Sequence, residues 1–404
     1  MVTPLAADAA PVDASEPTRQ FRVGVNLLWL VPGVVGGSEE YTTRLLRALA
    51  QIDHDDLHLT LFALAPFAEA HPDLVARYPT VLTRLDGRSK AERVAVESTW
   101  LPYEATRRNI DLLHHAGGVI PPGPAVGRIP AVLTIHDLQP LAMPENFSAV
   151  KRRWLTMMLP RSARRARMVM TPSDPTARSV VELLGIPAQR VHTVPHGVEP
   201  TPPVPAEQTA DVRDRYHLGG PVILYPAITY PHKDHLTLIR AFAQVARSRP
   251  EATLVLCGGV GPAEAEVAGA IRASGVGGQV RRTGRVPWSD LDALYSLADV
   301  VAVPSRFEGF GAPALEAMSN GRPLVAADAT ALPWVVGDGG LLVTPGDVEA
   351  WASTIGGLLD DPAEAARLAE RGRARAADFT WARSGAALAE GYRLAASADE
   401  DDNA

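Results

Sequence analysis

From Phe21 onward, short apolar runs alternate with segments of helical periodicity, and this alternation restricts the chain to a small set of folds. Runs without polar alternation are typical of strands that are buried on both faces. In the first half, such strands are expected at residues 21–30, 57–63, 111–114, 131–135 and 167–171, with a helix at 39–50. Because strands separated by helices connect through right-handed crossovers, the pattern predicts a mainly parallel sheet with helices on both faces.

The alternation stops in a proline-rich segment, residues 195–220, which we interpret as an interdomain linker. After it, strands are expected at 222–225, 253–257, 299–303, 323–326 and 341–343, and helices at 235–247, 290–297, 313–320 and 347–359. A length of 404 residues also exceeds one ordinary core of about 100–200 residues. We therefore expect an α/β chain of two Rossmann-like, doubly wound parallel-sheet domains that face each other across a cleft.

Composition narrows the functions open to such a chain. A formal net charge of −7 argues against a general nucleic-acid binder, and a single cysteine, Cys257, excludes an internal disulfide. The first twenty residues lack the basic start and the apolar core of a signal peptide. The sequence also lacks an apolar run of about 18 residues that could span a bilayer. We expect no nucleic-acid partner and a cytoplasmic location.

The strongest local signal is the segment SRFEGFGAPALE, residues 305–316, which follows the expected strand at 299–303. Its glycine turn leads into a helix whose Pro313 suits the first turn. Such a loop exposes backbone N–H groups at a helix N-terminus, where a diphosphate or a sugar oxygen gains hydrogen bonds. The carboxylates of Glu308 and Glu316 can accept hydrogen bonds from sugar hydroxyls. A helix start with ordinary acidic capping is the alternative.

This segment resembles the E-x7-E motif of glycosyltransferase family 4, a family of retaining enzymes with the GT-B fold. Four further segments are similar to the same family: GGSEEYTTRLL, LTIHDLQPLAMPENFS, VPHGVE and YPAITYPHKDHLTLIRAF. The resemblance extends from Phe21 to about Tyr392. Each segment alone is weakly specific, whereas their order along the chain is specific.

The resemblance implies roles in donor binding for residues of the second half. Glu316 would hold the ribose hydroxyls of the donor nucleotide, and Glu308 would bind a hydroxyl of the transferred sugar. Lys233, in PHKDH, would neutralise the diphosphate leaving group, which is electrostatic catalysis. A solvated loop lysine is the alternative for Lys233. The donor-binding turn, which offers backbone amides to the sugar and phosphates, would consist of Gly309, Phe310, Gly311 and Ala312.

Residues of the first half would complete the site. Gly36 and Gly37 precede a helix start and would let the backbone approach the leaving phosphate, although a plain turn fits the same residues. His136, in TIHD, would contact the sugar as a neutral imidazole that donates to an oxygen, with a structural histidine as the alternative. The resemblance thus implies that His136, Lys233 and Glu308 are the catalytic residues.

One departure from the family pattern concerns the phosphate clamp. Many members place an arginine a few residues before the lysine, where this chain has AITYP at residues 227–231. The second part of the clamp could be formed by backbone amides beside Lys233, by Arg306 or by Arg285. His196, in PHGV, is expected to shape the floor between the domains.

The resemblance also divides the chain. The last helical segment, FTWARSGAALAEGYR, is similar to the final GT-B helix that crosses back to the first domain, although a terminal helix of the second domain fits the same pattern. The expected units are a disordered tail (1–20), an acceptor-side domain (21–200), a donor domain (201–380), the crossing helix (381–396) and an acidic tail (397–404).

The expected mechanism needs no metal. No carboxylate can be named as a nucleophile, so retention of configuration is expected to follow from same-face attack assisted by the leaving phosphate. Two D-x-D patterns, at residues 53–55 and 290–292, resemble the cation-binding carboxylates of another glycosyltransferase fold. A solvated loop and a helix cap explain them better. We expect no metal site and no cofactor, with the nucleotide sugar acting as a substrate.

For the substrates, the PHK and IHD segments are similar to those of mannosyltransferases, so we expect a hexose to be transferred, mannose from GDP-mannose in the first place. A UDP-sugar is the second choice of donor. The acceptor would be a glycan, a lipid-linked or a small molecule. Two alternatives are a non-catalytic nucleotide-sugar binding partner and another GT-B enzyme, such as an epimerase or a phosphorylase. A dehydrogenase is disfavoured because no G-x-G-x-x-G turn lies in register.

A basic segment, residues 151–168, contains seven basic residues and no acid. Its apolar side chains could let it lie on an anionic membrane, which would make the protein peripheral at the inner face. The favoured interpretation is a basic helix that packs its apolar face on the sheet, because Pro160 is expected to interrupt a continuous amphipathic helix.

Overall fold

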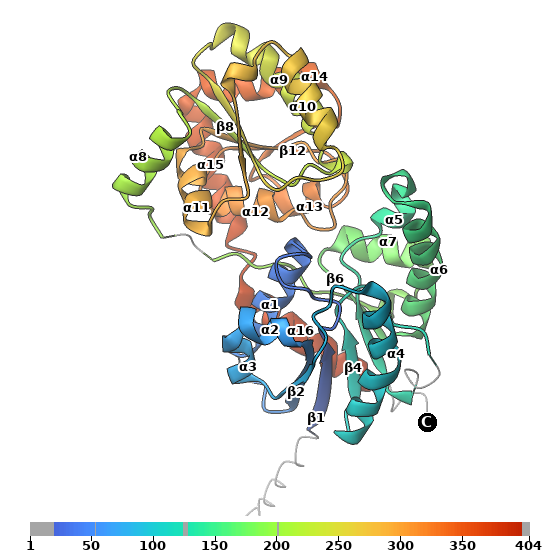
Figure 1. The fold of residues 1–404 in the computed structure, drawn as a ribbon. Coiled ribbons are helices and arrows are strands. Elements are labelled where there is room, and N and C mark those ends of the chain that lie inside the picture. The colour runs from blue at the N-terminus through green and yellow to red at the C-terminus, as the bar shows by residue number, and fades with distance from the viewer. Residues whose placement is uncertain (1–19, 53, 124–127, 200–201, 398–404) are drawn as a thin grey trace, which may run out of the picture.

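The computed structural model describes residues 20–52, 54–123, 128–199 and 202–397. In this part of the chain, two parallel sheets of seven and six strands are each covered by helices (Figure 1). The two domains confirm the expected α/β fold class. Residues 1–19 and 398–404, which hold nearly all of the two expected tails, lie outside the described residues.

The first sheet has the strand order β3-β2-β1-β4-β5-β6-β7. Its strands are β1 (Phe21–Asn26), β2 (Leu57–Leu64), β3 (Thr80–Thr83), β4 (Leu112–His115), β5 (Ala131–Thr134), β6 (Met168–Thr171) and β7 (Val191–Thr193). β1 ends earlier than expected because Asn26 turns the chain, its Oδ1 accepting from the Leu28 amide at 3.1 Å. The strands β3 and β7 were not expected, since their residues are mostly only partly buried at the sheet edges.

The second sheet has the strand order β10-β9-β8-β11-β12-β13. Its strands are β8 (Val222–Pro226), β9 (Thr253–Cys257), β10 (Val280–Gly284), β11 (Val300–Val303), β12 (Leu324–Ala327) and β13 (Leu341–Val343). The strands β9, β11 and β12 are buried throughout, as their apolar runs predict. β10 was not expected, because its sequence, VRRTG, is polar and lies at an edge.

Seven α-helices belong to the described part of the first half. They are α1 (Gly37–Leu49), α2 (Ala65–Ala70), α3 (Pro72–Arg77), α4 (Lys90–Arg107), α5 (Gln139–Ala142), α6 (Ala149–Arg165) and α7 (Asp174–Leu184). α6 continues through Pro160, so the expectation of an interruption was wrong. A proline removes one helical hydrogen bond, and the carbonyl that loses it here belongs to the exposed Thr156. Leu159 and Ala163 of α6 pack on the sheet.

The second half begins with a helix inside the expected linker. Its helices are α8 (Ala206–Arg215), α9 (His235–Ser248), α10 (Glu264–Ala273), α11 (Trp288–Leu297), α12 (Ala312–Ser319), α13 (Leu332–Val336), α14 (Val348–Asp360) and α15 (Pro362–Ala376). No helix was expected within residues 195–220, which were interpreted as the interdomain linker, but α8 lies there. This polar helix buries only Val212 and is held to α11 by an ion pair between Arg215 and Asp290.

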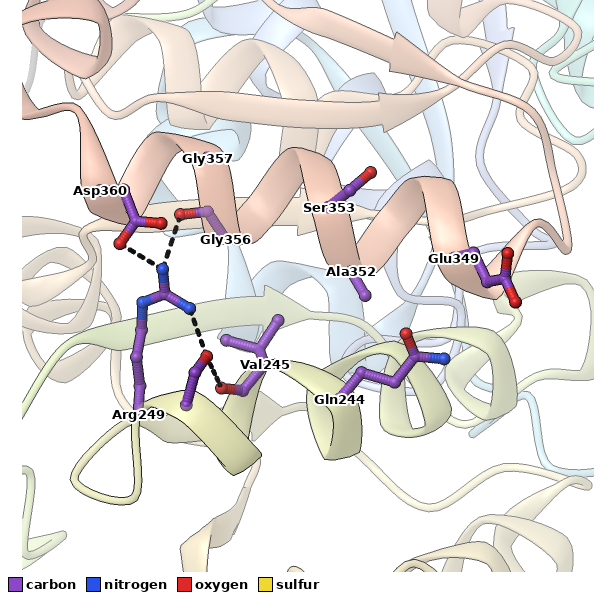
Figure 2. Close-up of a pocket in the computed structure, with 10 residues that line it drawn as sticks. Gln244, Val245, Arg249, Glu349, Ala352, Ser353, Gly356, Gly357 and Asp360 are labelled. Carbon is purple, nitrogen blue, oxygen red and sulfur yellow. Dashed lines mark hydrogen bonds and ion pairs between the residues drawn. The ribbon is translucent and has the colours of Figure 1, made fainter.

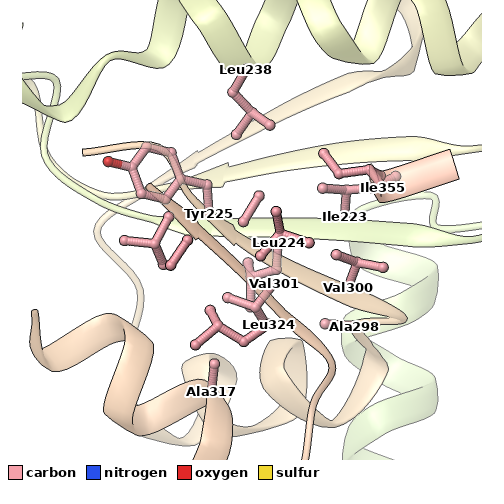
Figure 3. Packing of buried hydrophobic residues seen from close by; sticks show 14 of the residues in the cluster. Ile223, Leu224, Tyr225, Leu238, Ala298, Val300, Val301, Ala317, Leu324 and Ile355 are labelled. Carbon is pink, nitrogen blue, oxygen red and sulfur yellow. The ribbon is translucent and has the colours of Figure 1, made fainter. Parts of the chain in front are cut away.

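The core of the second domain lies between its sheet and the surrounding helices. Figure 3 shows side chains of β8, β11 and β12 meeting Leu238 of α9, Ile355 of α14 and Ala317 of α12. Leu224 and Val301 on the central strands have no exposed surface. Burying such a side chain stabilises the fold by about 1.5–3 kcal/mol. The core therefore fixes the strand ends from which the site loops depart.

The chain crosses between the domains twice, along two adjacent segments. The amide of Val198 donates to the Phe379 carbonyl at 2.8 Å, and Val198 also forms a bridge with Thr380. Helix α16 (Trp381–Ser397) follows the second crossing and lies beside α1 in the first domain (Figure 1). Its Leu388 and Tyr392 belong to the first domain's core.

Within the described residues, every helix is too short or too polar to cross a membrane.

Candidate active site

The loop between β11 and α12, residues 304–311, projects toward the first domain. α12 begins at Ala312, with Pro313 in its first turn. Gly311 precedes it with φ +105°, and a Cβ there would lie 2.6 Å from Leu332 Cδ2. Only glycine combines this left-handed backbone with the close approach of α13. We call residues 305–312 the donor loop.

Four consecutive amides of the donor loop have no hydrogen-bond partner in the described part of the chain. They are the N–H groups of Gly309, Phe310, Gly311 and Ala312. The preceding amide, of Glu308, donates to Thr330 Oγ1 at 2.9 Å. Unpaired N–H groups at a helix N-terminus form a site for an anion, because the helix dipole adds to their partial charges. The loop thus has the chemistry of a phosphate or sugar cradle.

Lys233 and Glu308, both predicted to be catalytic, form an ion pair. Lys233 Nζ lies 2.6 Å from Glu308 Oε1, and their side chains are only 16% and 11% exposed. Tyr225 fixes the backbone beside the lysine, because its hydroxyl donates to the Lys233 carbonyl at 2.7 Å. The structure therefore places an ammonium group directly beside the donor loop, where it can neutralise charge on a phosphate.

Glu316 lies in the second turn of α12 and accepts a hydrogen bond from the Tyr295 hydroxyl at 2.8 Å. Desolvation by the surrounding protein raises the pKa of Glu316 to about 7, against the lowering effects of Tyr295 and of Arg44. Arg44 belongs to α1 of the first domain, so Glu316 faces that domain. A carboxylate in this position can accept hydrogen bonds from two adjacent hydroxyls.

His136 follows β5 at the corresponding edge of the first sheet. Its Nε2 lies 2.9 Å from the Ala116 carbonyl, which can only accept, so Nε2 carries the hydrogen. Burial lowers the pKa of His136, which keeps the ring neutral near pH 7. In the neutral ring Nδ1 then accepts a hydrogen bond. With Nε2 bound to the Ala116 carbonyl, the neutral ring has no further N–H for a sugar oxygen, which differs from the expected donation.

Gly309 joins the donor loop to the first domain. Its carbonyl accepts hydrogen bonds from Ser173 Oγ at 2.6 Å and from Thr176 Oγ1 at 2.9 Å, both at the start of α7. A Cβ on Gly309 would lie 2.0 Å from the His136 carbonyl oxygen. Because a trans peptide directs its N–H opposite to its C=O, these hydroxyls also fix the direction of the Phe310 amide.

Ser173, Thr176 and Asp137 are site residues that sequence reasoning missed. Ser173 was recognisable as a helix cap, since its Oγ accepts from the Thr176 amide, but its contact with the other domain has no sequence signal. Asp137 follows His136 directly, and its carboxylate interacts with the charges of Glu308 and Lys233. Desolvation raises its pKa, which marks it as a carboxyl group enclosed between the two domains.

Gly36 and Gly37 form the start of α1. Gly36 has φ +70°, and a Cβ on either glycine would meet no atom within 4 Å. The loop is therefore open, but no contact joins these glycines to Lys233 or Glu308 within the described chain. Open backbone at a helix N-terminus suits the approach of a phosphate, and the role of these glycines stays a prediction.

The two arginines considered for the phosphate clamp have different partners in the structure. Arg306 Nε is bound to Asp234 Oδ2 at 2.8 Å, and Asp234 caps α9. Arg285 Nη1 instead reaches across the cleft to the Gly33 carbonyl at 3.1 Å, in the loop that leads to Gly36. Arg285 thus contacts the first domain, whereas Arg306 is bound within the second.

An aromatic stack forms the floor between the domains. The ring of His196 stacks on Tyr41 at 4.3 Å and on Phe310 at 4.5 Å between centroids. Phe310 is 3% exposed, so its ring belongs to this buried floor. Burial lowers the pKa of His196 to about 3, and the neutral ring suits a stack of this kind.

The described residues contain no cluster of three metal-ligating side chains. In the second D-x-D pattern, Asp290 is paired with Arg215. In the first pattern, Asp53 lies outside the described residues. A surface groove of about 660 Å³ lies elsewhere, between α9 and α14, where Arg249 is bound to the Gly356 carbonyl and Asp360 (Figure 2). It lies away from the donor loop, on the side of the second domain that faces away from the first (Figure 1).

Family models match both halves of the chain. The model for "Glycosyltransferase Family 4" matches residues 35–201, and the model for "Glycosyl transferases group 1" matches residues 211–375. Among solved structures, HepE from Anabaena in complex with UDP and glucose superposes with a TM-score of 0.71 at 23% identity, covering 92% of this chain and 99% of that chain. Sucrose-phosphate synthase from Thermosynechococcus elongatus superposes with a TM-score of 0.72, also at 23% identity, covering 93% and 98%. These likenesses support the GT-B fold.

Three curated relatives illustrate the sequence similarity. O-antigen chain mannosyltransferase B of Escherichia coli is 32% identical over 268 residues, which cover 65% of this chain and 70% of that protein. The MMP α-(1→4)-mannosyltransferase of Mycolicibacterium hassiacum is 32% identical over 62% of each chain, and the D-inositol 3-phosphate glycosyltransferase of Xylanimonas cellulosilytica is 37% identical over 54% of this chain and 55% of its own. The paired domains, the donor loop and these matches together show that the chain belongs to glycosyltransferase family 4 and has the GT-B fold.

Proposed function

We propose that the protein transfers a hexose from a nucleotide sugar with retention of configuration and without a metal ion. The four unpaired amides of the donor loop, beside the ammonium of Lys233, are the observation that carries this proposal. Together they offer a diphosphate the hydrogen bonds and positive charge that a bound cation supplies in other sites. No metal is therefore required to stabilise the leaving group.

Each predicted residue has a role in this reaction. Glu316 accepts hydrogen bonds from the ribose, and Glu308 binds a hydroxyl of the sugar while it holds Lys233 in place. Lys233 and the loop amides stabilise charge as the bond between sugar and phosphate breaks. Nδ1 of His136 accepts from a sugar hydroxyl, and Gly36 and Gly37 close on the leaving phosphate. The acceptor attacks from the face that the phosphate leaves.

GDP-mannose is the proposed donor, and a UDP-sugar is the second candidate. Two relatives named as mannosyltransferases, each 32% identical, support a mannose donor. A UDP-sugar remains the second candidate because HepE, which is 23% identical, has been solved in complex with UDP and with UDP-glucose. The acceptor is a glycan, a lipid-linked or a small molecule.

We also propose a cytoplasmic protein whose basic segment, residues 151–168, can contact the inner face of an anionic membrane together with the start of α6. Exposed arginines and the exposed Val150 and Met157, which are 82% and 57% exposed, support this contact. Basic residues beside exposed apolar side chains favour binding to anionic lipid surfaces.

A donor screen tests the proposed function. Release of nucleoside diphosphate would be measured for GDP-, UDP-, dTDP- and ADP-sugars, each with and without EDTA. Turnover of one donor, unchanged by EDTA, is the expected result. Strict dependence on an added metal ion would overturn the mechanism, and absence of turnover with every donor would favour the non-catalytic binding partner.

A further inference from the structure

A series of aromatic rings connects the donor loop to the first domain. The ring of His196 lies between those of Tyr41 and Phe310, with centroids 4.3 Å and 4.5 Å away and interplanar angles of 24° and 11°. Tyr41 belongs to α1, His196 to the first crossing segment and Phe310 to the donor loop. We call these three residues the ring chain. The stack spans both domains, so it requires α1 and the donor loop to face each other as they do here.

The backbone on either side of His196 is held in place. The Tyr41 hydroxyl donates to the Val194 carbonyl at 2.7 Å, two residues before the ring. Directly after the ring, a Cβ on Gly197 would lie 2.3 Å from the backbone nitrogen of Trp381. Glycine therefore allows the two crossing segments to pack this closely. The ring of His196 cannot shift without moving both segments.

The ring of Phe310 is enclosed on its other sides by the second domain. Phe379 and Trp334 meet it edge to face, with centroids 5.7 Å and 6.2 Å away and interplanar angles of 81° and 74°. Aromatic pairs favour edge-to-face and offset-stacked arrangements of this kind. Three neighbouring rings thus hold the side chain of Phe310 in one position.

A side chain held in this way determines where the donor-loop amides point. The peptide before Phe310 is already held through the Gly309 carbonyl by two hydroxyls of the first domain. The peptide after it contains the N–H of Gly311, which has no partner among the described residues. The Phe310 carbonyl of the same peptide likewise accepts no hydrogen bond in the described chain. The direction of this second peptide therefore depends on the Phe310 ring.

Tyr41 extends the series to the sugar side of the site. Its ring meets the ring of His136 edge to face, with centroids 5.6 Å apart and an interplanar angle of 85°. The same tyrosine thus contacts His136, which is proposed to bind the sugar, and His196, which supports the donor loop. A movement of α1 would displace both contacts together.

We propose that the ring chain directs the amides of Phe310 and Gly311 toward the donor diphosphate, which makes Tyr41 and His196 positioning residues. This inference rests on the proposed function, because it takes the ligand of these amides to be the diphosphate of a nucleotide sugar. Hydrogen-bond donors that are already aimed at a developing charge stabilise it without a reorganisation cost. Through Tyr41, the same rings align His136 with the leaving group.

Binding of inorganic pyrophosphate to the full chain, measured by isothermal titration calorimetry, tests the role of His196 without turnover. His196→Ala removes both stacking contacts and should weaken binding about tenfold. His196→Phe keeps a flat ring and should bind within about threefold of the parent. His192→Ala is the matched control, because it removes a half-buried histidine whose Nε2 lies 2.9 Å from the Ala387 carbonyl of α16. This control should bind as the parent does.

Tyr41→Leu removes the other side of the stack and should weaken pyrophosphate binding to a similar extent. Equal binding by His196→Ala and the parent would overturn the proposal, as would equal losses in His196→Ala and His196→Phe. A loss in His192→Ala as large as that in His196→Ala would also overturn it, since the cause would then be a general loss of stability.

Steady-state kinetics test whether the rings act as one unit. Tyr41→Leu should lower kcat about tenfold, whereas Tyr41→Phe, which removes only the hydroxyl, should change kcat by at most about threefold. Adding His196→Ala to Tyr41→Leu should lower kcat by no more than about twofold further, because either change already interrupts the chain. Effects that multiply would overturn the coupling. Absence of turnover in the donor screen would refute the proposed function, whereas pyrophosphate binding would still test the ring chain.

Discussion

The two domains present different chemical groups to each other at the candidate site: backbone amides on one and side chains on the other. On the second domain, the donor side consists of free backbone amides and the enclosed ion pair of Lys233 and Glu308. On the first domain, the facing wall consists of side chains, among them the neutral His136 and the enclosed Asp137. Backbone amides can bind the diphosphate that nucleotide sugars have in common. Side chains, by contrast, can differ from one sequence to another. The difference is that one wall of the site depends on backbone groups held by a glycine-rich turn, whereas the other depends on particular side chains.

The largest effect is expected from Lys233→Met, which removes the cation beside the donor loop. It should lower kcat by about 10²–10³-fold, because leaving-group stabilisation is lost and Glu308 is left enclosed without its partner. Steady-state kinetics with the donor from the screen measure the loss. Arg247→Met, on α9, is the control. A decrease in kcat of less than about fivefold would show that Lys233 is not the cation that stabilises the leaving group.

The second largest effect is expected from Gly309→Ala, which tests whether the donor loop must pack against the first domain. The added Cβ would lie 2.0 Å from the His136 carbonyl oxygen, so the donor loop should be held away from the first domain. We expect kcat to fall about 10- to 100-fold. Gly278→Ala, where a Cβ meets nothing within 4 Å, is the matched control. Equal activity of the two variants would show that closure at Gly309 is not needed.

The pH dependence of donor binding tests the role of Glu316. Its pKa of about 7 in the free protein should fall when ribose hydroxyls bind the carboxylate. Donor affinity should therefore be constant above pH 7 and decline below it, by up to about tenfold per pH unit. In Glu316→Gln this slope should disappear. A parent whose affinity stays constant from pH 5 to pH 8 would contradict the ribose assignment.

The smallest effect is expected from Thr176→Val, which removes one of the two hydroxyls on the Gly309 carbonyl. Loss of one hydrogen bond of about 0.5–1.5 kcal/mol should lower kcat about 2- to 12-fold, with little change in the KM of the acceptor. Thr176→Ser should restore the rate, and Ser179→Ala, on the same helix, should not affect it. Loss of thermal stability without loss of kcat would assign Thr176 a purely structural role.

The residues that surround the donor loop could be anticipated from the sequence more fully than those that meet it from the first domain, for a physical reason. The donor loop and the first turns of α12 form one continuous segment that contains the glycines, the proline and both glutamates. The spacing of these residues along the sequence is therefore visible without the structure. The hydroxyls of Ser173 and Thr176 act only when distant segments meet, and no pattern within either segment encodes that contact. For the same reason, the enclosure of Asp137 between the two domains was not predicted.

The fold shows a similar division. Buried strands such as β9 and β12 were predicted because both of their faces are apolar. The edge strands β3, β7 and β10 were missed, since an edge strand can be short and polar. Helix α8 was missed because its polar sequence and its flanking prolines resemble a linker, and a single buried valine gives no periodic signal.

The central claim is that the donor diphosphate binds to the amides of residues 309–312 and to Lys233. A crystal structure with the nucleoside diphosphate released in the donor screen tests it most directly. The phosphate oxygens should lie within hydrogen-bond distance of at least two of these amides and of Lys233 Nζ, with the ribose at Glu316. A diphosphate bound elsewhere, for example in the groove between α9 and α14, would contradict the account.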